Sequence, residues 1–315
     1  MTVDESQTDT NTTDDDLTAA DVAWNIDTIL PDGATPADLF DRADALADEL
    51  TSLRGRVGTL DAGELAAAMH TLAELQDLMS RAGYHAMLAF STATDDPARG
   101  AAMAAAQERS TAIGTKLIFI DLEWAAADDD HVASVLADPR LDFCRHHLDN
   151  LRLSRPYLLS EAEETIVAEK SQTGFAAWTR LFDELTSAIA VDLPDELGGP
   201  GRPLMQATSM LQHPDRDVRK KVAEGINVGL EPGLRTRAFL FNTLLLDKSI
   251  DDRLRGYPSW ISSRNLANEA SDESVQALVD AVVDNYSIPQ RWYALKAKVL
   301  GIDKLADYDL SLIHI

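Results

Sequence analysis

The histidines are the first residues to consider, because imidazole nitrogens bind zinc and transfer protons near neutral pH. They occur at positions 70, 85, 131, 146, 147, 213 and 314. Two histidines four residues apart on a helix share one face and can hold one zinc ion, but this spacing is absent and no His-Glu pair occurs. His146 and His147 are adjacent, so on a helix they point about 100° apart. We therefore expect surface or packing roles for the histidines.

A cysteine just before this pair invites comparison with a Cys/His nucleophile. Cys144 is the only cysteine of the chain. The apolar residues Leu141, Phe143 and Leu148 surround it in sequence, which favours a buried thiol over a reactive one. We predict that Cys144 is structural.

Paired carboxylates and two arginines lie a few residues further on. Glu161, Glu163 and Glu164 could serve acid/base chemistry, but they occupy the first turn of a predicted helix, where negative charge offsets the helix dipole. We therefore predict a structural role for them. Arg152 and Arg155 could contact the carboxylate of a peptide; alternatively they tie a loop to a helix end or pair with these acids.

An aromatic stripe and a glycine-rich stretch follow. Phe175, Trp178 and Phe182 have the i, i+3, i+7 spacing of a helix face, so we predict that they face the core. The stretch from Gly198 to Gly201 lacks the Gly-Lys-Ser/Thr ending of a phosphate-binding loop, and its prolines oppose helix entry. We predict a loop joining two short strands between residues 186 and 209.

Helices must position all these side chains. Capping residues at Thr35, Asp61, Asp96 and Ser160 precede apolar residues with helical spacing. We predict a mostly α fold: a multi-helix N-terminal domain with a pair of long antiparallel helices from about 61 to 127, then the small β-hairpin. Further helices are expected at about 214–230, 234–253, 272–285 and 289–300.

The composition is that of a globular chain with an unusual charge. Of 315 residues, 45% are hydrophobic and 26% charged, but 53 acidic against 28 basic residues give a net charge of −25. The acidity is spread along the whole chain, so we expect adaptation to high salt in a halophile, with attraction of cationic partners as the alternative. Nucleic-acid binding is disfavoured, because phosphates would be repelled.

The N-terminus and the cysteine count bear on location. Residues 1–20 are rich in Asp, Thr and Ser, so we predict a disordered acidic tail. This segment lacks the basic start and apolar run of a signal peptide, and no stretch of the chain is long and apolar enough to span a bilayer. With a single cysteine as well, we expect a cytoplasmic protein without membrane partners.

Several segments together carry a resemblance to a known family. They are Arg155–Glu164 continuing into Gly174–Leu185, then Asp215–Ala223, then Arg291–Gly301 followed by Tyr308 and Asp309. Their order and separations resemble the N-terminal region of oligoendopeptidase F enzymes, which are zinc metallopeptidases of the thimet-oligopeptidase type. The resemblance covers roughly Trp24 to Asp309.

The resemblance implies a mostly helical body with a deep channel, zinc at its base, and short unstructured peptides as substrates. This chain would supply one wall and part of the roof. The family's His-Glu-x-x-His motif and later Glu are absent, so no catalytic, cofactor-binding or metal residue is assigned. Zinc is expected in the full-length enzyme and not in this chain. The expected domains are a tail (1–20), an N-terminal helical domain (21–193) and the incomplete start of the peptidase domain (194–309).

The last residues have a separate interpretation. The codons CTG TCT CTT ATA CAC ATC encode Leu-Ser-Leu-Ile-His-Ile, the sequence at Leu310–Ile315, and they form the end of a transposase adapter used for sequencing libraries. We expect residues 310–315 to be an artefact of that kind and exclude His314 from functional reasoning. The chain would then be an N-terminal part of an enzyme, inactive alone.

A second class of function stays open, namely a stand-alone acidic helical protein that binds partners without catalysis. A reading frame that continues past Asp309 into His-Glu-x-x-His would favour the peptidase. In that case the helices after Pro214 lack their covering partners. We then expect partial exposure of apolar side chains at Leu240, Phe241, Leu244, Leu245, Leu278, Val282 and Leu295.

Overall fold

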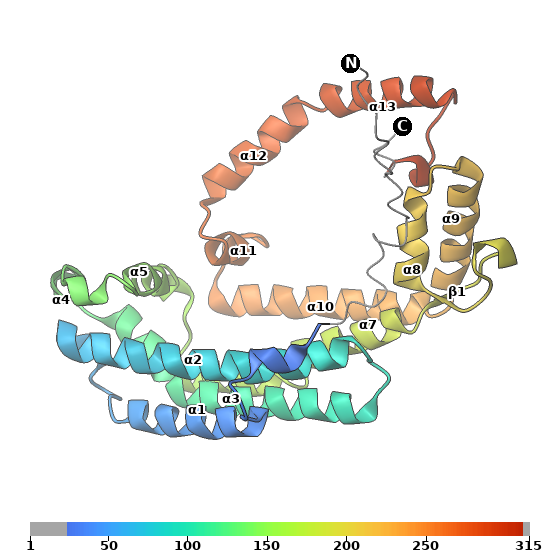
Figure 1. Ribbon diagram of the computed structural model, residues 1–315. Helices are drawn as coiled ribbons and strands as arrows, with labels where there is room; N and C mark the ends of the chain where they lie inside the picture. Colours follow the sequence, from blue (N-terminus) through green and yellow to red (C-terminus); the bar gives the residue numbers. More distant parts are fainter. Residues whose placement is uncertain (1–23, 311–315) are drawn as a thin grey trace, which may run out of the picture.

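The computed structural model describes residues 24–310, and most of this range is helical (Figure 1). The predicted tail (1–20), residues 21–23 and residues 311–315 lie outside the described residues. The elements up to the hairpin are α1 (Pro36–Thr51), α2 (Ala62–Ser91), α3 (Pro97–Ala126), α4 (Asp129–Leu136), α5 (Arg145–Leu153), α6 (Glu161–Ser171) and α7 (Phe175–Ser187). They are followed by β1 (Ala190–Val191), β2 (Arg202–Pro203), α8 (Leu204–Ser209), α9 (Arg216–Leu230), α10 (Leu234–Arg255), α11 (Ser262–Ala267), α12 (Asp272–Asp284) and α13 (Ser287–Leu300).

The helix starts follow the capping residues. Thr35, Asp61 and Ser160 each accept a hydrogen bond from the backbone N–H three residues on. The carboxylate of that third residue accepts one from the N–H of the capping residue, which completes a capping box. Asp96 accepts from the backbone of Ala98 and Arg99 ahead of α3. These local bonds confirm the predicted starts.

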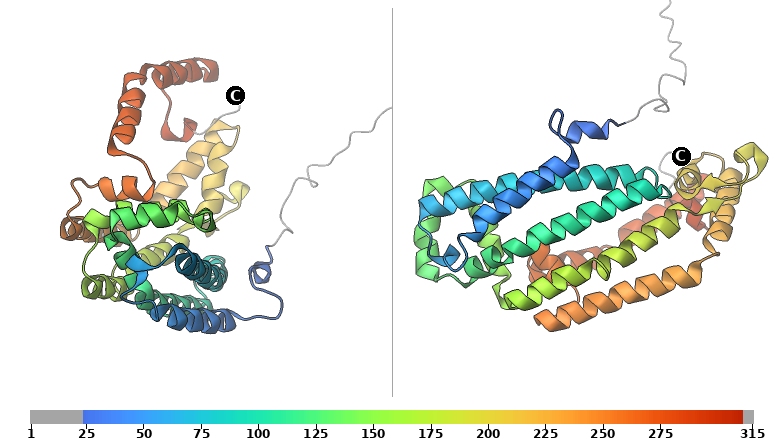
Figure 2. Two further views of the ribbon diagram at one scale, coloured as in Figure 1. Left: turned by 90° about the vertical axis from the view of Figure 1, so that its left-hand side faces the viewer. Right: turned by 90° about the horizontal axis from the view of Figure 1, so that it is seen from below.

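The first half of the chain packs as a bundle around one core. α2 and α3 form the predicted long antiparallel pair, and α1 packs against both. Seen from below, α2, α3, α6 with α7, and α10 run side by side (Figure 2). The core contains large side chains such as Leu65, Ile113 and Trp124 together with alanines, for example Ala43 and Ala47, that let the helices approach closely.

The predicted hairpin is present and begins a second, smaller core. β1 and β2 pair antiparallel, with Ala190 opposite Pro203. α9 lies directly against the hairpin because two of its residues are glycines. A Cβ at Gly225 would lie 2.8 Å from a Leu193 methyl, and one at Gly229 would lie 3.0 Å from the carbonyl oxygen of Ala190.

This second core contains Val191, Leu193, Ala207 and Val222, and it is separate from the core of the bundle. A division of the chain at residues 193 and 194 stays a proposal.

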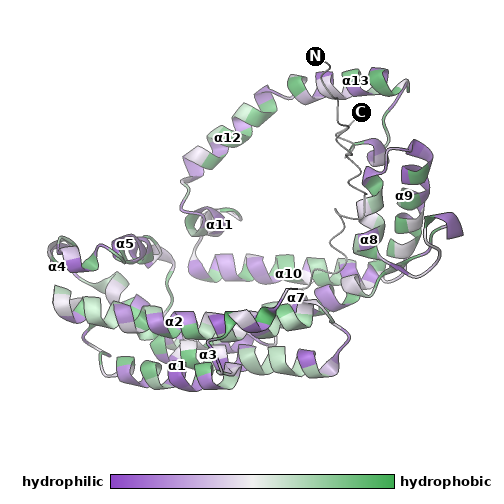
Figure 3. Cartoon of the chain, in the orientation of Figure 1, coloured by the Kyte–Doolittle hydropathy of each residue, from purple (hydrophilic) through white to green (hydrophobic). Residues whose placement is uncertain are grey.

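The last third of the chain is an arch of helices. α10, α11, α12 and α13 follow one another around an open ring, which closes where the Asp307–Asp309 turn returns to α9 (Figure 1). Hydrophobic segments recur along α12 and α13 between hydrophilic ones (Figure 3). Of the apolar side chains predicted to be exposed, those at 241, 245, 278, 282 and 295 are exposed and Leu244 is half-buried.

The prediction for Leu240 was wrong, because this side chain is 1% exposed. α10 packs along α7, so one side of α10 is covered by the bundle although its other side is open.

The prediction that the aromatic stripe of α7 faces the core was also wrong. Phe175 is 57% exposed and Phe182 is 38% exposed. Only Trp178, which meets the ring edge of Phe239 on α10 at 6.3 Å, has an aromatic partner across this seam.

Two groups of contacts tie the arch to the bundle. Arg255 at the end of α10 forms a two-pronged ion pair with Glu164 of α6, with nitrogen–oxygen distances of 2.7 and 2.9 Å. Just after α11, the Glu269 carboxylate accepts a hydrogen bond from the side-chain amide of Asn150 at 2.6 Å. It also lies 2.7 Å from Nε2 of His146, and both of these partners are on α5. Glu269 has a φ of 55°, a strained value for a non-glycine residue.

Candidate functional site

The structure gives the candidate histidines packing and surface roles, as predicted. The side chain of His146 is 76% exposed and meets Glu269, and His147 is exposed. The others have local partners: His70 stacks on Phe143, His85 lies beside Asp27, His131 meets the Leu60 carbonyl, and His213 accepts from the Asp215 N–H. His314 lies outside the described residues.

Zinc would need about three protein ligands around one point. Within residues 24–310, no group of three or more His, Cys, Asp or Glu side chains could hold a metal ion. The described residues therefore do not fit a zinc site.

Cys144 is a buried structural thiol, as predicted. Its sulfur lies 3.6 Å from the carbonyl oxygen of Leu141, and the fully buried side chains of Leu141 and Leu148 belong to the same core. Burial raises the pKa of the Cys144 thiol above its usual value, which opposes formation of the reactive thiolate.

The three glutamates at the start of α6 each have a separate structural partner. Glu163 completes the capping box with Ser160, whose hydroxyl and N–H lower its pKa. Glu161 pairs with Arg54. Glu164 pairs with Arg255, and this guanidinium holds the pKa of Glu164 below its usual value. The predicted place of the three glutamates in the first turn of a helix is confirmed.

The two arginines before α6 contact helix ends, which agrees only in part with the alternative of a loop tied to a helix end, because Arg152 itself lies on α5. Arg152 donates to the carbonyl oxygens of Trp124 and Ala127 at the end of α3, at 2.8 and 3.1 Å. It also pairs with Asp129, as does Arg155 at 3.5 Å. Neither arginine pairs with the glutamates of α6.

A buried ionic cluster lies where the arch returns to α9, and sequence reasoning missed it. The Asp309 carboxylate is fully buried and accepts from Arg216 Nε and Nη2, from Arg219 Nη2, and from the N–H of Ala306. Arg219 is 1% exposed and also donates to the carbonyl oxygens of Tyr308, His213 and Pro214, each at 2.9 Å.

Desolvation alone would raise the pKa of Asp309, but the hydrogen bonds from Arg216, Ala306 and Arg219 outweigh it and lower the pKa below its usual value. Both halves of the cluster lie in segments singled out in the sequence, yet their pairing across about ninety positions had no signal. The cluster anchors the end of the arch on α9.

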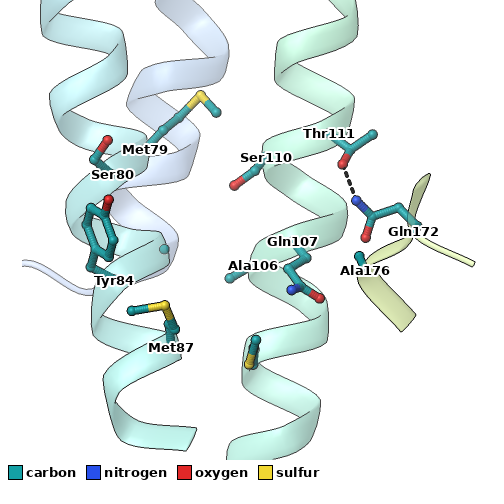
Figure 4. A pocket seen from close by; sticks show the side chains of 12 residues that line it. Met79, Ser80, Tyr84, Met87, Ala106, Gln107, Ser110, Thr111, Gln172 and Ala176 are labelled. Atoms are coloured by element: carbon teal, nitrogen blue, oxygen red, sulfur yellow. Dashed lines mark hydrogen bonds between the residues drawn. The ribbon is translucent and has the colours of Figure 1, made fainter. Parts of the chain in front are cut away.

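A groove lies between α2 and α3. It has a volume of about 390 Å³. Figure 4 shows the two helices side by side, with Met79, Tyr84 and Met87 on one wall and Ala106 and Gln107 on the other. Gln172, at the junction of α6 and α7, donates to the hydroxyl of Thr111 and closes one side.

The groove differs chemically from the rest of the surface. Its lining residues are Met79, Ser80, Gly83, Tyr84, Met87, Met103, Ala106, Gln107, Ser110, Thr111, Gln172 and Ala176, and none is charged. Two other hollows of similar size include charged residues, Asp192 and Arg237 in one and Arg99 and Arg109 in the other. Methionine side chains adapt to ligands of varied shape, and the amides and hydroxyls can hydrogen-bond a peptide backbone.

The match to known families is partial in length. A family model described as Oligopeptidase F matches residues 123–190. The chain is similar to the Group B oligopeptidase PepB of Streptococcus agalactiae serotype III (strain NEM316), with 26% identity over 188 residues, covering 58% of this chain and 31% of PepB. It is similar to the oligopeptidase PepF of Bacillus subtilis (strain 168), with 25% identity over 183 residues, covering 56% of this chain and 27% of PepF.

A solved structure agrees in fold over more of the chain. The crystal structure of oligoendopeptidase-F from Enterococcus faecium has a TM-score of 0.72 at 21% sequence identity, covering 87% of this chain and 55% of that one. The chain thus matches under a third of the length of these two curated relatives and about half of the solved structure. No helix of the described residues is long and apolar enough to cross a membrane.

Proposed function

We propose that this chain is part of a zinc-dependent endopeptidase of the oligoendopeptidase F family, which cleaves short, unstructured peptides; the similarity to members of that family in sequence and fold supports the proposal. The observation that carries the proposal is the agreement of fold over 87% of the chain with an oligoendopeptidase-F structure, at a TM-score of 0.72. The matches to PepB and PepF support the same family from the sequence.

In this proposal the chain contributes a helical wall and not the reaction centre. The bundle of α1–α7 forms a stable base, and the arch of α10–α13 lies around a space that a longer protein would fill. The exposed apolar side chains of the arch, such as Phe241, Leu278 and Leu295, support this role, because so much apolar surface in water is costly. Zinc and its ligands would come from residues outside those described.

The test compares this chain with the longer product of its source reading frame. Both are purified in molar salt, their zinc content is measured, and each is incubated with an internally quenched peptide of about eight residues. We expect zinc and cleavage only in the longer protein. One tightly held zinc per molecule of the 315-residue chain would contradict the proposal. So would a reading frame without His-Glu-x-x-His.

The alternative function, an acidic helical protein that binds partners without catalysis, is favoured by one observation, the uncharged α2–α3 groove. Cleavage by the longer protein would remove this alternative as the main function. Absence of cleavage and of zinc in both proteins would support it.

A further inference from the structure

We propose that the α2–α3 groove binds a peptide segment with one large apolar side chain flanked by basic residues. The inference rests on the groove itself and not on the peptidase assignment. It can therefore fail while the proposed function stands, and the reverse also holds.

The groove has the size and chemistry for an apolar side chain. Ligand pockets commonly have volumes of about 300–1,000 Å³ with apolar walls and a few polar groups, and this groove has about 390 Å³. Ala106 is buried at its floor, Met79 and Met103 are half-buried, and Tyr84 and Met87 are exposed. A charged side chain would lose its water here without an opposite charge among the lining residues, so an uncharged apolar group is favoured.

A glycine in the middle of α2 keeps the groove open. Gly83 lies inside a 30-residue helix, where glycine costs about 0.5–1 kcal/mol relative to alanine. A Cβ at this position would have nothing within 4 Å, so close packing does not explain the glycine. A larger side chain there would extend into the groove.

The site continues far enough to hold a segment of several residues. A second hollow along α7 shares Gln107, Gln172 and Ala176 with the groove and extends to Arg180 and Glu184. The two glutamine amides at the junction can pair with the N–H and C=O groups of an extended peptide.

The charge around the groove selects the flanking residues. Glu108 follows Gln107 on α3, Glu169 lies one turn before Gln172 on α6, and both are exposed. Within residues 24–310 neither takes part in an ion pair. Of the basic residues near them, Arg109 and Arg180 pair with Asp41 and Glu184, and Lys170 is exposed. With a net charge of −25 on the whole chain, basic residues beside the apolar one are attracted and acidic residues are repelled.

The experiment is calorimetric titration with acetylated and amidated Lys-Gly-Leu-Gly-Lys, at the lowest salt at which the circular dichroism spectrum stays native. We expect saturable binding with one site per chain. Replacing the leucine of the peptide by glycine, or both lysines by glutamates, should each weaken binding by about tenfold or more. Equal binding of the three peptides, or no binding of the first at millimolar concentration, would overturn the proposal.

Variants of the protein locate the site. Gly83→Met fills the groove and raises helix propensity, so it should abolish binding while stability is kept or increased. The matched control is Gly114→Met, a helical glycine of α3 with equally open surroundings that does not line the groove. Met87→Lys, at an exposed position, is a second way to block the groove if the first variant does not fold. Binding that survives both groove variants would refute the assignment.

The charge argument has its own pair of variants. Glu108→Gln together with Glu169→Gln should weaken binding by about three- to tenfold at low salt and little in molar salt, because salt screens exposed charges. Glu49→Gln on α1 removes an exposed charge elsewhere and should have no effect. Sedimentation velocity is run in parallel. A dimer that Gly83→Met dissolves would show that a second copy of the chain occupies the groove, and would overturn the proposal.

Discussion

Removing the charge of Asp309 should destabilise the arch strongly, although the change Asp309→Asn keeps the shape of the side chain. The carboxylate accepts from Arg216 at 2.9–3.2 Å and from Arg219 at 2.9 Å, and neither Asp309 nor Arg219 is more than 1% exposed. A neutral amide would leave two guanidinium groups without an opposite charge, and its NH₂ group would face one of their donors.

The size of the effect follows from burial. Two unit charges 4 Å apart attract by about 4 kcal/mol in surroundings of intermediate polarity, and breaking a buried pair by removing one partner costs about 3–5 kcal/mol. We expect Asp309→Asn to lower the free energy of unfolding by an amount within that range. The matched control is Asp251→Asn, which removes the exposed and weaker partner of Arg255, whose pairing with Glu164 persists. An exposed pair of this kind contributes about 0–1 kcal/mol.

The assay is urea unfolding followed by circular dichroism, with hydrogen exchange to locate the change at α9 and at residues 302–310. The loss in Asp309→Asn should persist in molar salt, because buried charges are screened less than exposed ones. A loss below about 1 kcal/mol, or one no larger than that of Asp251→Asn, would refute the account of a buried charge cluster.

The pH dependence gives an independent check. The pKa of Asp309 lies below its usual value of 3.8 in the folded protein. A carboxyl with a lowered pKa contributes its stabilisation above the pKa of the unfolded chain, and this is lost as pH falls through the folded pKa. The stability difference between wild type and Asp309→Asn should therefore be constant above about pH 5 and shrink below pH 4. A difference that grows on acidification would contradict the assigned direction.

Three other outcomes are expected. Arg255→Met should lower the free energy of unfolding by about 2–4 kcal/mol, because it leaves the largely buried Glu164 carboxylate unpaired. Hydrogen exchange in α6 and α10 should become faster, and unchanged exchange would contradict a stabilising ion pair between these helices. In thermal unfolding, Gly225→Ala should destabilise the protein by about 1–3 kcal/mol, because the added methyl group overlaps with the hairpin. Gly83→Ala should stabilise it by about 0.5–1 kcal/mol. A Gly225→Ala variant more stable than Gly83→Ala would contradict the close contact of α9 with the hairpin. The Cys144 thiol should react with a colorimetric disulfide reagent much more slowly in the native protein than in urea, and equal rates would mean that it is not buried.

Local structure could be read from the sequence with good accuracy. The starts of α1, α2, α3 and α6 were predicted from Thr35, Asp61, Asp96 and Ser160, because a capping side chain bonds to N–H groups only two or three residues away. The hairpin followed from alternating residues around a glycine-rich loop. The structural role of Cys144 and the first-turn glutamates followed from the same short-range reasoning.

The aromatic stripe of α7 shows where this reasoning stops. Its spacing defines one helix face but cannot tell what that face meets. In the structure α10 meets this face at Trp178, while Phe175 stays 57% exposed and Phe182 38% exposed. The prediction for Leu240 was wrong in the opposite direction: it was expected to be partly exposed, but the contact between α7 and α10 buries it.

The sequence by itself therefore determined the helices, their ends, the hairpin, the acidic character and the family resemblance, since all of these depend on neighbouring residues or on order along the chain. Only the tertiary structure decided that Asp309 pairs with Arg216 and Arg219, that Arg255 reaches Glu164, and that α2 and α3 leave an uncharged groove between them. These features join atoms that are tens of residues apart. Whether they form depends on how rigid helices are placed against one another, and no local pattern of residues encodes that placement.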